Sequence, residues 1–200
     1  AGAWLPRLLP GSGLATQEDA VAFVEGGGTR DVDLTYIDPP YNQHSYFGNY
    51  HIWETLMRND APEAYGVARK RMDTRQNRSA FNSKRAFQEV FERTILGTES
   101  RYLLVSFSNE GYIAADEMRR LLAEKGHVAQ VDVDFRRYVG AQIGIHSPTG
   151  QKVGQVSHLR NTEHLFLVGE REITERAVEG MPGVIVSDQA TATGSEAPST

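Results

Sequence analysis

Residues 33–41 read Asp-Leu-Thr-Tyr-Ile-Asp-Pro-Pro-Tyr (DLTYIDPPY). The apolar run at residues 33–37 predicts a short buried β-strand. Pro39 and Pro40 must end that strand, because neither residue has a backbone N–H to donate to a neighbouring strand. In open α/β sheets, ligands bind beyond the carboxyl ends of the strands. The stretch therefore places Asp38 where chemistry is expected.

Helices and strands alternate in the predictions for the rest of the chain. Helical patterns cover residues 17–24, 51–58, 83–96 and 111–125, and strand patterns cover residues 102–107, 127–135 and 163–168. Polar or glycine-rich segments at 42–50 and 59–80 predict loops, and the segment at 140–157 predicts a long loop or a hairpin. The alternation favours an α/β sheet that is mostly parallel, with an antiparallel strand near the C-terminus. We assign residues 1–170 to this domain and the polar residues 171–200 to a disordered tail.

Composition excludes several classes of protein. The chain has 200 residues, no cysteine and a formal net charge of −5, and the missing cysteines exclude disulfides and thiolate zinc sites. No apolar run reaches the roughly 18 residues of a membrane span, and no secretory signal is recognisable. We therefore expect a cytoplasmic protein. The 6 histidines lack the spacing of metal ligands, so we predict no metal site.

Positive charge gathers in one segment of this acidic chain. Residues 69–85 contain seven Lys and Arg residues against one acid, Asp73. Such local asymmetry predicts a phosphate-binding face, and a solvated basic loop is the alternative. The basic residues that we expect to contact nucleic acid are Arg69, Lys70, Arg71, Arg75, Arg78 and Lys84.

Aromatic residues cluster shortly after Tyr41, next to the basic segment. Tyr46 and Tyr50 are expected to stack on bases or to close a pocket. The alternative is a loop whose aromatic side chains pack on the core of the domain, and we expect this of Trp53.

The segment from Asp33 to Glu54 (DLTYIDPPYNQHSYFGNYHIWE) resembles the catalytic region of DNA adenine-N6 methyltransferases, specifically the Dam-related group. The resemblance covers about residues 15–170. It implies a Rossmann-like sheet and a site-specific enzyme that transfers a methyl group from S-adenosylmethionine to the N6 amine of adenine, with DNA as its partner. The sequence does not identify a companion restriction endonuclease.

The resemblance assigns catalysis to Asp38, Pro39, Pro40 and Tyr41. The amine nitrogen of adenine is a poor nucleophile, so its hydrogens must be held by acceptors. Asp38 can accept one N–H and the Pro39 carbonyl can accept the other. Tyr41 offers a flat face to a base that has been extruded from the duplex.

The resemblance also implies contacts outside the Asp-Pro-Pro-Tyr tetrad. Asp19, in the segment ATQEDAVAFV, and Phe81 are expected to contact the cofactor. Asn109, at the end of the segment VSFSN, is expected to help shape the adenine pocket.

The sequence departs from the family pattern in one respect. The glycine-rich cofactor loop of the Phe-x-Gly-x-Gly kind is not found before Asp19, so we expect the domain to be incomplete at its N-terminus. The alternatives are methylation of RNA adenine or of a protein amide by the same loop, and a non-catalytic nucleic-acid-binding fragment. Asp38 favours adenine, because amide-modifying relatives usually have Asn there. A sheet without its first strands would expose an edge, so marginal stability or self-association is expected.

Overall fold

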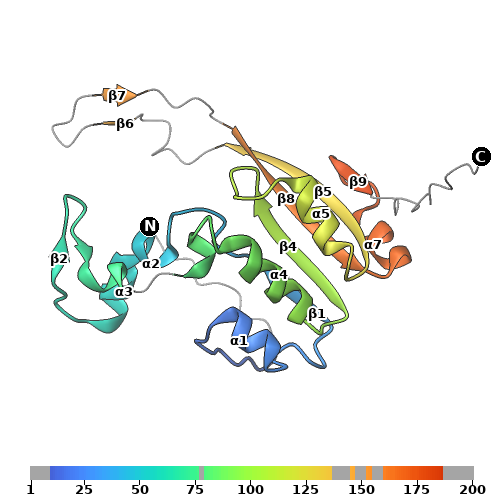
Figure 1. Ribbon diagram of the computed structural model, residues 1–200, viewed down its shortest axis with the longest axis horizontal. Coiled ribbons are helices and arrows are strands. Elements are labelled where there is room, and N and C mark those ends of the chain that lie inside the picture. The colour runs from blue at the N-terminus through green and yellow to red at the C-terminus, as the bar shows by residue number, and fades with distance from the viewer. Residues whose placement is uncertain (1–9, 77–78, 137–144, 147–151, 155–159, 187–200) are drawn as a thin grey trace, which may run out of the picture.

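The computed structural model describes residues 10–76, 79–136, 145–146, 152–154 and 160–186. The largest sheet has five strands in the order β1-β4-β8-β5-β9 (Figure 1). These strands are β1 (Leu34–Ile37), β4 (Tyr102–Ser108), β5 (His127–Arg136), β8 (Arg160–Gly169) and β9 (Val184–Val186). The helices are α1 (Ala20–Glu25), α2 (Tyr46–Asn49), α3 (His51–Arg58), α4 (Phe87–Gly97), α5 (Ala115–Leu122), α7 (Arg171–Val178) and the 3-10 helices η1 (Met72–Arg75) and η2 (Ala80–Asn82). In this part of the chain, no helix is long and apolar enough to cross a membrane.

The connections explain the directions of the strands. Along the chain, α4 comes between β1 and β4, and α5 comes between β4 and β5. The strands β1, β4 and β5 run in the same direction. β8 inserts between β4 and β5 and is antiparallel to both, and β9 is antiparallel to β5. The α/β class is confirmed, but the expected mostly parallel pairing is wrong, since β1–β4 is the one parallel pair among the described strands. A strand pattern does not reveal between which neighbours the strand will insert.

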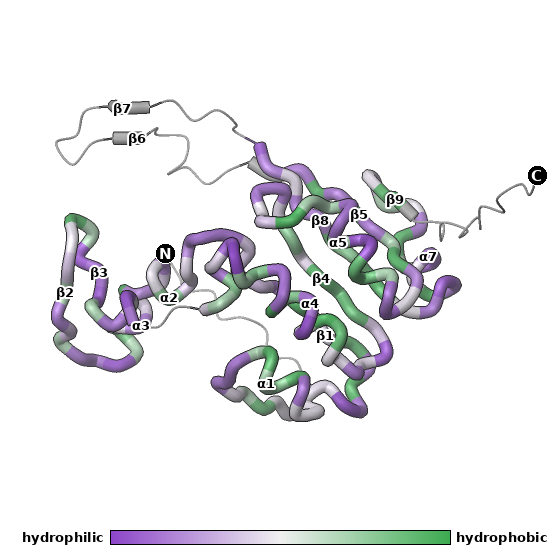
Figure 2. Tube along the Cα trace, in the orientation of Figure 1, coloured by the Kyte–Doolittle hydropathy of each residue, from purple (hydrophilic) through white to green (hydrophobic). Residues whose placement is uncertain are grey.

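One face of the sheet is covered by α4 and α5. Phe87, Phe91 and Ile95 follow one another at intervals of four residues, so they share the buried side of α4. The rings of Phe87 and Phe91 stack at 5.5 Å, and Phe107 of β4 lies 5.7 Å from Phe87. Figure 2 shows hydrophobic residues concentrated along β4 and α4. The helix begins at Phe87, later than the predicted start at residue 83, because residues 83–86 form a turn.

The C-terminal segment covers part of the opposite face. Val178 of α7 packs with Ala129 of β5, and Thr174, one turn earlier, is also buried. The predicted tail is therefore wrong for residues 171–186, which form α7 and β9. The mostly polar composition hid a narrow apolar stripe on a short helix. Residues 187–200 lie outside the described residues.

Residues 43–76 form a small lobe beside the sheet (Figure 1). The lobe contains α2, α3, η1 and a hairpin of β2 (Ala64–Tyr65) and β3 (Lys70–Arg71). The predicted helix at 51–58 is confirmed, whereas the loops expected at 42–50 and 59–80 contain α2 and this hairpin. Elements of two to four residues are too short to show a period in the sequence. The predicted hairpin within 140–157 is present as β6 (Ile145–His146) and β7 (Lys152–Gly154).

β1 lies at the edge of the sheet and is less buried than expected. Leu34 is 48% exposed and Tyr36 is 56% exposed. Thr35 and Ile37, which point to the face that α4 covers, are half-buried. The apolar run therefore marks a strand with only one covered face.

Candidate active site

A pocket of about 800 Å³ opens at the carboxyl end of β1. Its size falls within the range of small-molecule sites, roughly 300–1,000 Å³. The residues singled out from the sequence that line it are Asp19, Asp38, Pro39, Pro40, Tyr46 and Phe81. The structure thus brings together side chains from the start of α1, the loop after β1, α2 and η2. Tyr41 lies beside this pocket and is not among its lining residues.

Contacts with Phe107, Asn82 and Tyr112 anchor the loop that carries the tetrad. The edge of the Tyr41 ring packs on Phe107 with 5.8 Å between ring centroids, and the Tyr41 carbonyl accepts a hydrogen bond from the Tyr112 N–H at 3.1 Å. Asn82 donates to the Asn42 carbonyl at 2.8 Å, and the Tyr112 hydroxyl donates to the Asn82 carbonyl at 3.0 Å. These contacts fix both ends of residues 41–42 without using the carboxylate of Asp38.

Burial shifts the acid–base properties of the pocket. Burial raises the pKa of the Asp38 carboxyl above its ordinary value. Burial first, and then the nearby charge of Asp38, raises the pKa of Tyr46 to about 12. Tyr46 therefore keeps its proton at neutral pH and presents a neutral phenol to the pocket.

Sequence reasoning missed a second carboxylate, Glu163 of β8. The backbone of Glu163 pairs with that of Ser108, and its Oε1 accepts a hydrogen bond from the Ser106 hydroxyl. Burial and then the charge of Glu163 raise the pKa of Tyr41, while a hydrogen bond with Ser108 lowers it. The signal was absent from the sequence because Glu163 reaches the tetrad only through the antiparallel insertion of β8.

The side of the pocket expected to hold the cofactor contains both predicted residues. Asp19 caps α1 by accepting the Ala22 N–H at 3.1 Å, and the buried Phe81 packs edge-on against Phe87. The buried hydroxyl of Thr35, which also lines the pocket, has no hydrogen-bond partner within the part of the chain that the structure describes. Among the described residues, no group of three or more His, Asp or Glu side chains could hold a metal ion.

Arg71 is not available to a nucleic acid. Its side chain is 4% exposed and forms ion pairs with Asp60 at 2.6 Å and Asp73 at 2.9 Å. It also donates to the Thr55 hydroxyl at 3.2 Å. The prediction of a phosphate contact at Arg71 is therefore wrong, because the carboxylates of the same lobe already neutralise this guanidinium.

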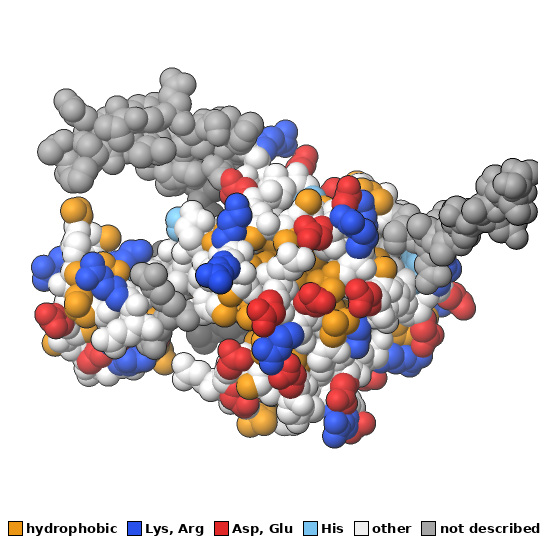
Figure 3. Space-filling model, viewed as in Figure 1, with side chains coloured by type: hydrophobic (Ala, Val, Ile, Leu, Met, Phe, Trp, Pro, Cys, Tyr) orange, Lys and Arg blue, Asp and Glu red, His pale blue; other side chains and the backbone are white. Residues whose placement is uncertain are grey.

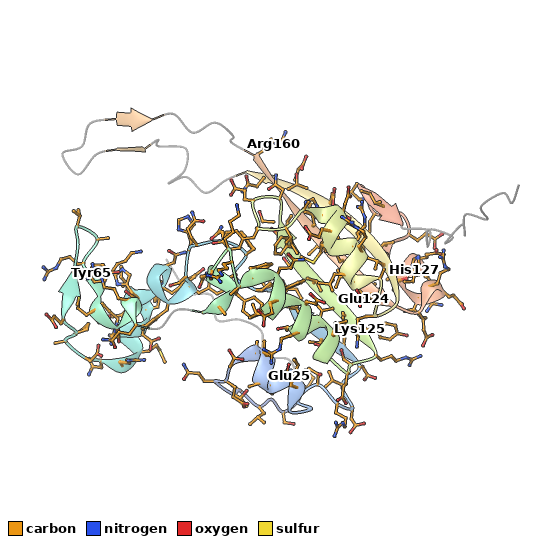
Figure 4. The ribbon with its side chains drawn as sticks, in the orientation of Figure 1. Glu25, Tyr65, Glu124, Lys125, His127 and Arg160 are labelled. Carbon is orange, nitrogen blue, oxygen red and sulfur yellow. The ribbon has the colours of Figure 1, made fainter. Side chains whose placement is uncertain are left out.

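The other basic residues differ in their surroundings. Arg75 lies over the ring of Tyr65 at 4.1 Å. Figure 4 shows Tyr65 in the lobe, away from the sheet. Lys70 lines a crevice of about 280 Å³ together with Ser45 and Asn82. Arg69 and Lys84 are exposed, and Arg78 lies outside the described residues.

The aromatic cluster faces solvent more than expected. Trp53 is 65% exposed, so its predicted place in the core is wrong. Among the described residues, α3 packs with α2 and β3, which are elements of four and two residues. Tyr46 and Tyr50 are in edge-on contact with 6.4 Å between ring centroids. Asn109 is exposed after β4, does not line the pocket, and donates its backbone N–H to Thr162.

The sheet, with Asp38, Pro39 and Pro40 lining a pocket at the carboxyl end of its edge strand, defines an α/β protein with a ligand-sized site at that strand end. The chain belongs to the D12 class N6 adenine-specific DNA methyltransferase family, whose sequence profile matches residues 16–120.

Several curated proteins are similar to this chain. Type II methyltransferase M.FokI of Planomicrobium okeanokoites is 36% identical over 94 residues, which cover 47% of this chain and 14% of that protein. Modification methylase StsI of Streptococcus sanguinis is 30% identical over 127 residues, 62% of this chain and 19% of that protein. Type II methyltransferase M.NlaIII of Neisseria lactamica is 30% identical over 106 residues, 53% of this chain and 31% of that protein. The chain thus spans less than a third of each of these relatives. No solved structure matches it significantly.

Proposed function

We propose that this chain carries out the methyl transfer to the N6 amine of adenine in DNA, with S-adenosylmethionine as the methyl donor. The observation that carries the proposal is the common pocket of Asp38, the two prolines and the cofactor-side residues Asp19 and Phe81. Membership of the adenine-specific family and the names of the relatives, type II methyltransferases and modification methylases, support it. The same names favour a role in a restriction–modification system.

The pocket suits the proposed cofactor. Its volume, about 800 Å³, accommodates a molecule of that size. The Thr35 hydroxyl is a buried polar atom in need of a partner, and Phe81 offers an aromatic surface. We assign Asp19, Thr35 and Phe81 to cofactor binding. When bound, the cofactor supplies a methyl group on a positively charged sulfur.

The tetrad would hold the amine of the adenine. Asp38 accepts one N–H of the amine and the Pro39 carbonyl accepts the other, so the nitrogen lone pair can leave the plane of the ring. Pro39 has a fixed φ and no N–H, which leaves its carbonyl aimed without a competing donor. The Tyr41 ring, wedged on Phe107, offers a fixed face to the base. Held in this way, the reactants reach near-attack geometry.

The reaction balances without a further reagent. A bond forms between N6 and the methyl carbon, the carbon–sulfur bond breaks, and its electron pair stays on sulfur. The nitrogen would then lose one proton, and Asp38, which is proposed to accept an N–H of the amine, could take it. The raised pKa of Asp38 helps it to take that proton transiently.

Asp38→Asn tests the proposal, because it keeps the shape of the side chain and replaces an accepting oxygen by a donor. We expect methylation of adenine-containing duplex DNA to fall by roughly a hundredfold or more. Asp33→Asn is the matched control, since Asp33 is exposed at the start of the same strand and away from the pocket, and we expect less than a twofold change.

Calorimetric titration with S-adenosylmethionine separates the remaining alternatives. Binding of the cofactor together with loss of activity in Asp38→Asn supports the enzyme. DNA binding without cofactor binding would instead favour the non-catalytic fragment. Methylation of RNA or of a protein amide, without methylation of DNA, would show that the same loop acts on another substrate.

A further inference from the structure

The hairpin of the lobe turns two consecutive basic side chains to opposite sides. Lys70 and Arg71 are neighbours in β3, and side chains alternate in direction along a strand. Arg71 turns toward α3, where it pairs with Asp60 and donates to the Thr55 hydroxyl. Lys70 turns toward α2, since a β-carbon at Gly48 would lie 3.8 Å from the Lys70 Nζ. One of the two cations is therefore neutralised inside the lobe, and the other is held beside α2.

The crevice that receives the Lys70 side chain contains no acid. Its volume is about 280 Å³, and none of its lining residues is Asp or Glu. Lys70 is half-buried and forms no ion pair among the described residues, whereas Arg71 pairs with two carboxylates. Because taking a charge out of water costs free energy unless it is paired, this cation favours an anionic ligand.

The neighbouring groups offer the donors that an anion needs. The Ser45 Oγ accepts the Gly48 N–H at 2.9 Å, and its own hydroxyl proton has no acceptor among the described residues. Gln43 and Asn49 also line the crevice, and their exposed side-chain amides can donate as well. Lysine ammonium, hydroxyl and amide groups are those with which proteins bind the phosphate oxygens of nucleic acids. The lining therefore suits a phosphate group.

The crevice lies next to the pocket that contains Asp38. Ser45 lines the crevice, and the following residue, Tyr46, lines the pocket. Asn82 lines the crevice too, and it donates to the His44 carbonyl at 3.3 Å, which ties η2 to the loop after the tetrad. A strand that delivers a base to the pocket would therefore bring one of its phosphates close to the crevice. Figure 3 shows further Lys and Arg side chains on the surface of the lobe.

We propose that this crevice, with Lys70 as its cation, binds a backbone phosphate of the DNA strand that carries the target adenine. The inference rests on the proposed function and adds to it the point at which the lobe holds the DNA. A contact of this kind positions the strand without reading its sequence. It also divides the basic segment, because Lys70 contacts the strand while Arg71 stabilises the lobe.

Lys70→Met in the 200-residue chain tests the inference, because methionine keeps most of the side chain and removes its charge. The probe is a labelled duplex that contains adenine, with affinity measured by fluorescence anisotropy at several salt concentrations. Each phosphate that a cation neutralises contributes about 0.9 to the slope of log K against log salt concentration. We expect Lys70→Met to reduce the magnitude of this slope by about one, equally for duplexes of different sequence. Lys70→Arg should keep the slope.

Arg85→Met is the matched control. It removes one positive charge from an exposed residue of the basic segment that does not line the crevice, so the slope should equal that of the unaltered chain. An unchanged slope in Lys70→Met would overturn the inference. Equal reductions in Lys70→Met and Arg85→Met would do the same, because they would reveal a general effect of net charge. So would the absence of measurable DNA binding by the unaltered chain.

Inorganic phosphate distinguishes the source of the ligand. Its binding is followed by the amide NMR signals of Ser45 and Gly48, and we expect shifts in the unaltered chain that disappear in Lys70→Met. Phosphate binding that depends on Lys70, together with a DNA slope that does not, would assign the crevice to a free phosphate compound and overturn the DNA contact. A DNA slope that depends on Lys70 supports the contact whether or not free phosphate binds.

The design separates this inference from the proposed function. Binding is measured without cofactor and also with Asp38→Asn, so it does not require methylation. A slope that depends on Lys70, without methylation of any adenine-containing DNA, would count against the proposed function alone. Methylation by the unaltered chain, together with an unchanged slope in Lys70→Met, would count against the crevice alone.

Discussion

The sheet and the lobe are built in opposite ways. The sheet buries aromatic and aliphatic side chains, with Phe87, Phe91 and Phe107 completely enclosed. The lobe buries the guanidinium of Arg71 between two carboxylates and leaves Trp53 and its apolar neighbours in solvent. An apolar core gives non-directional stability, whereas a charged cluster fixes geometry at the cost of desolvation. The lobe therefore exposes an apolar surface, whereas the sheet supports the loop that carries Asp38.

Phe91→Ala should produce the largest loss in the free energy of unfolding. It would show that the apolar core of the sheet supplies most of the stability. Removing a completely buried Phe costs about 3–5 kcal/mol, because the transfer energy is lost and a cavity remains. Leu56→Ala, an exposed apolar change in the lobe, should stay within about 0.5 kcal/mol. Denaturant unfolding measures both changes, and equal effects would remove the contrast between the two regions.

Arg71→Met should loosen the lobe and spare the sheet. Asp60 and Asp73 would lose their common partner and repel each other, so amide hydrogen exchange should quicken over residues 55–75. Protection in β4 and α4 should be unchanged. Arg58→Met is the control, because Arg58 also pairs with Asp73 but is half exposed, and it should alter exchange much less. Exchange that quickens equally in the sheet would mean that the two regions unfold together.

Acid should act on the lobe in a similar but weaker way. Hydrogen bonds from Arg71 hold the pKa values of Asp60 and Asp73 below the ordinary value. Their contribution to stability is complete above the ordinary carboxyl pKa and is lost as the pH falls through the lowered values. Hydrogen exchange followed downward from pH 5 should show the lobe loosening first. Arg71→Met should lack this acid step, and its persistence there would assign the step to other carboxylates.

Tyr112→Phe should have a small effect on a contact that links the two regions. It removes the hydrogen bond from the Tyr112 hydroxyl to the Asn82 carbonyl, which helps to hold the start of the lobe against the sheet. We expect a loss of about 1 kcal/mol in unfolding free energy and a modest fall in methylation from a looser tetrad. A larger fall in methylation than Asp38→Asn produces would contradict the roles proposed for the loop.

The predictions that succeeded rest on local chemistry. The two prolines end a strand wherever they stand, so the position of Asp38 beyond β1 was predictable. The four predicted strands and the helix at 51–58 were recognisable from composition and period. Asp19 and Phe81, named from a resemblance, lie in the same pocket as Asp38. Their roles in binding the cofactor stay a prediction.

The predictions that failed concern contacts and coverage that are settled only when the chain folds. Arg71 looked like a free cation because the carboxylate of Asp60, eleven residues away, meets it only after the hairpin forms. Trp53 looked like a core residue because its size favours burial, but no element of the described part of the chain covers it, and it is 65% exposed. Residues 171–178 looked like a tail because the strand against which α7 packs, β5, lies more than 30 residues earlier.

The sequence by itself determined the position of the Asp-Pro-Pro-Tyr loop, the α/β class and the family, because backbone constraints and side-chain chemistry act over a few residues. The tertiary structure alone decided that β8 enters the sheet between β4 and β5, which brings Glu163 to the tetrad. It also decided that the basic segment is partly neutralised and that Tyr50 and Trp53 face solvent. These features depend on which surfaces meet when the chain folds. Burial and charge pairing arise from contacts between segments and are not properties of any single segment.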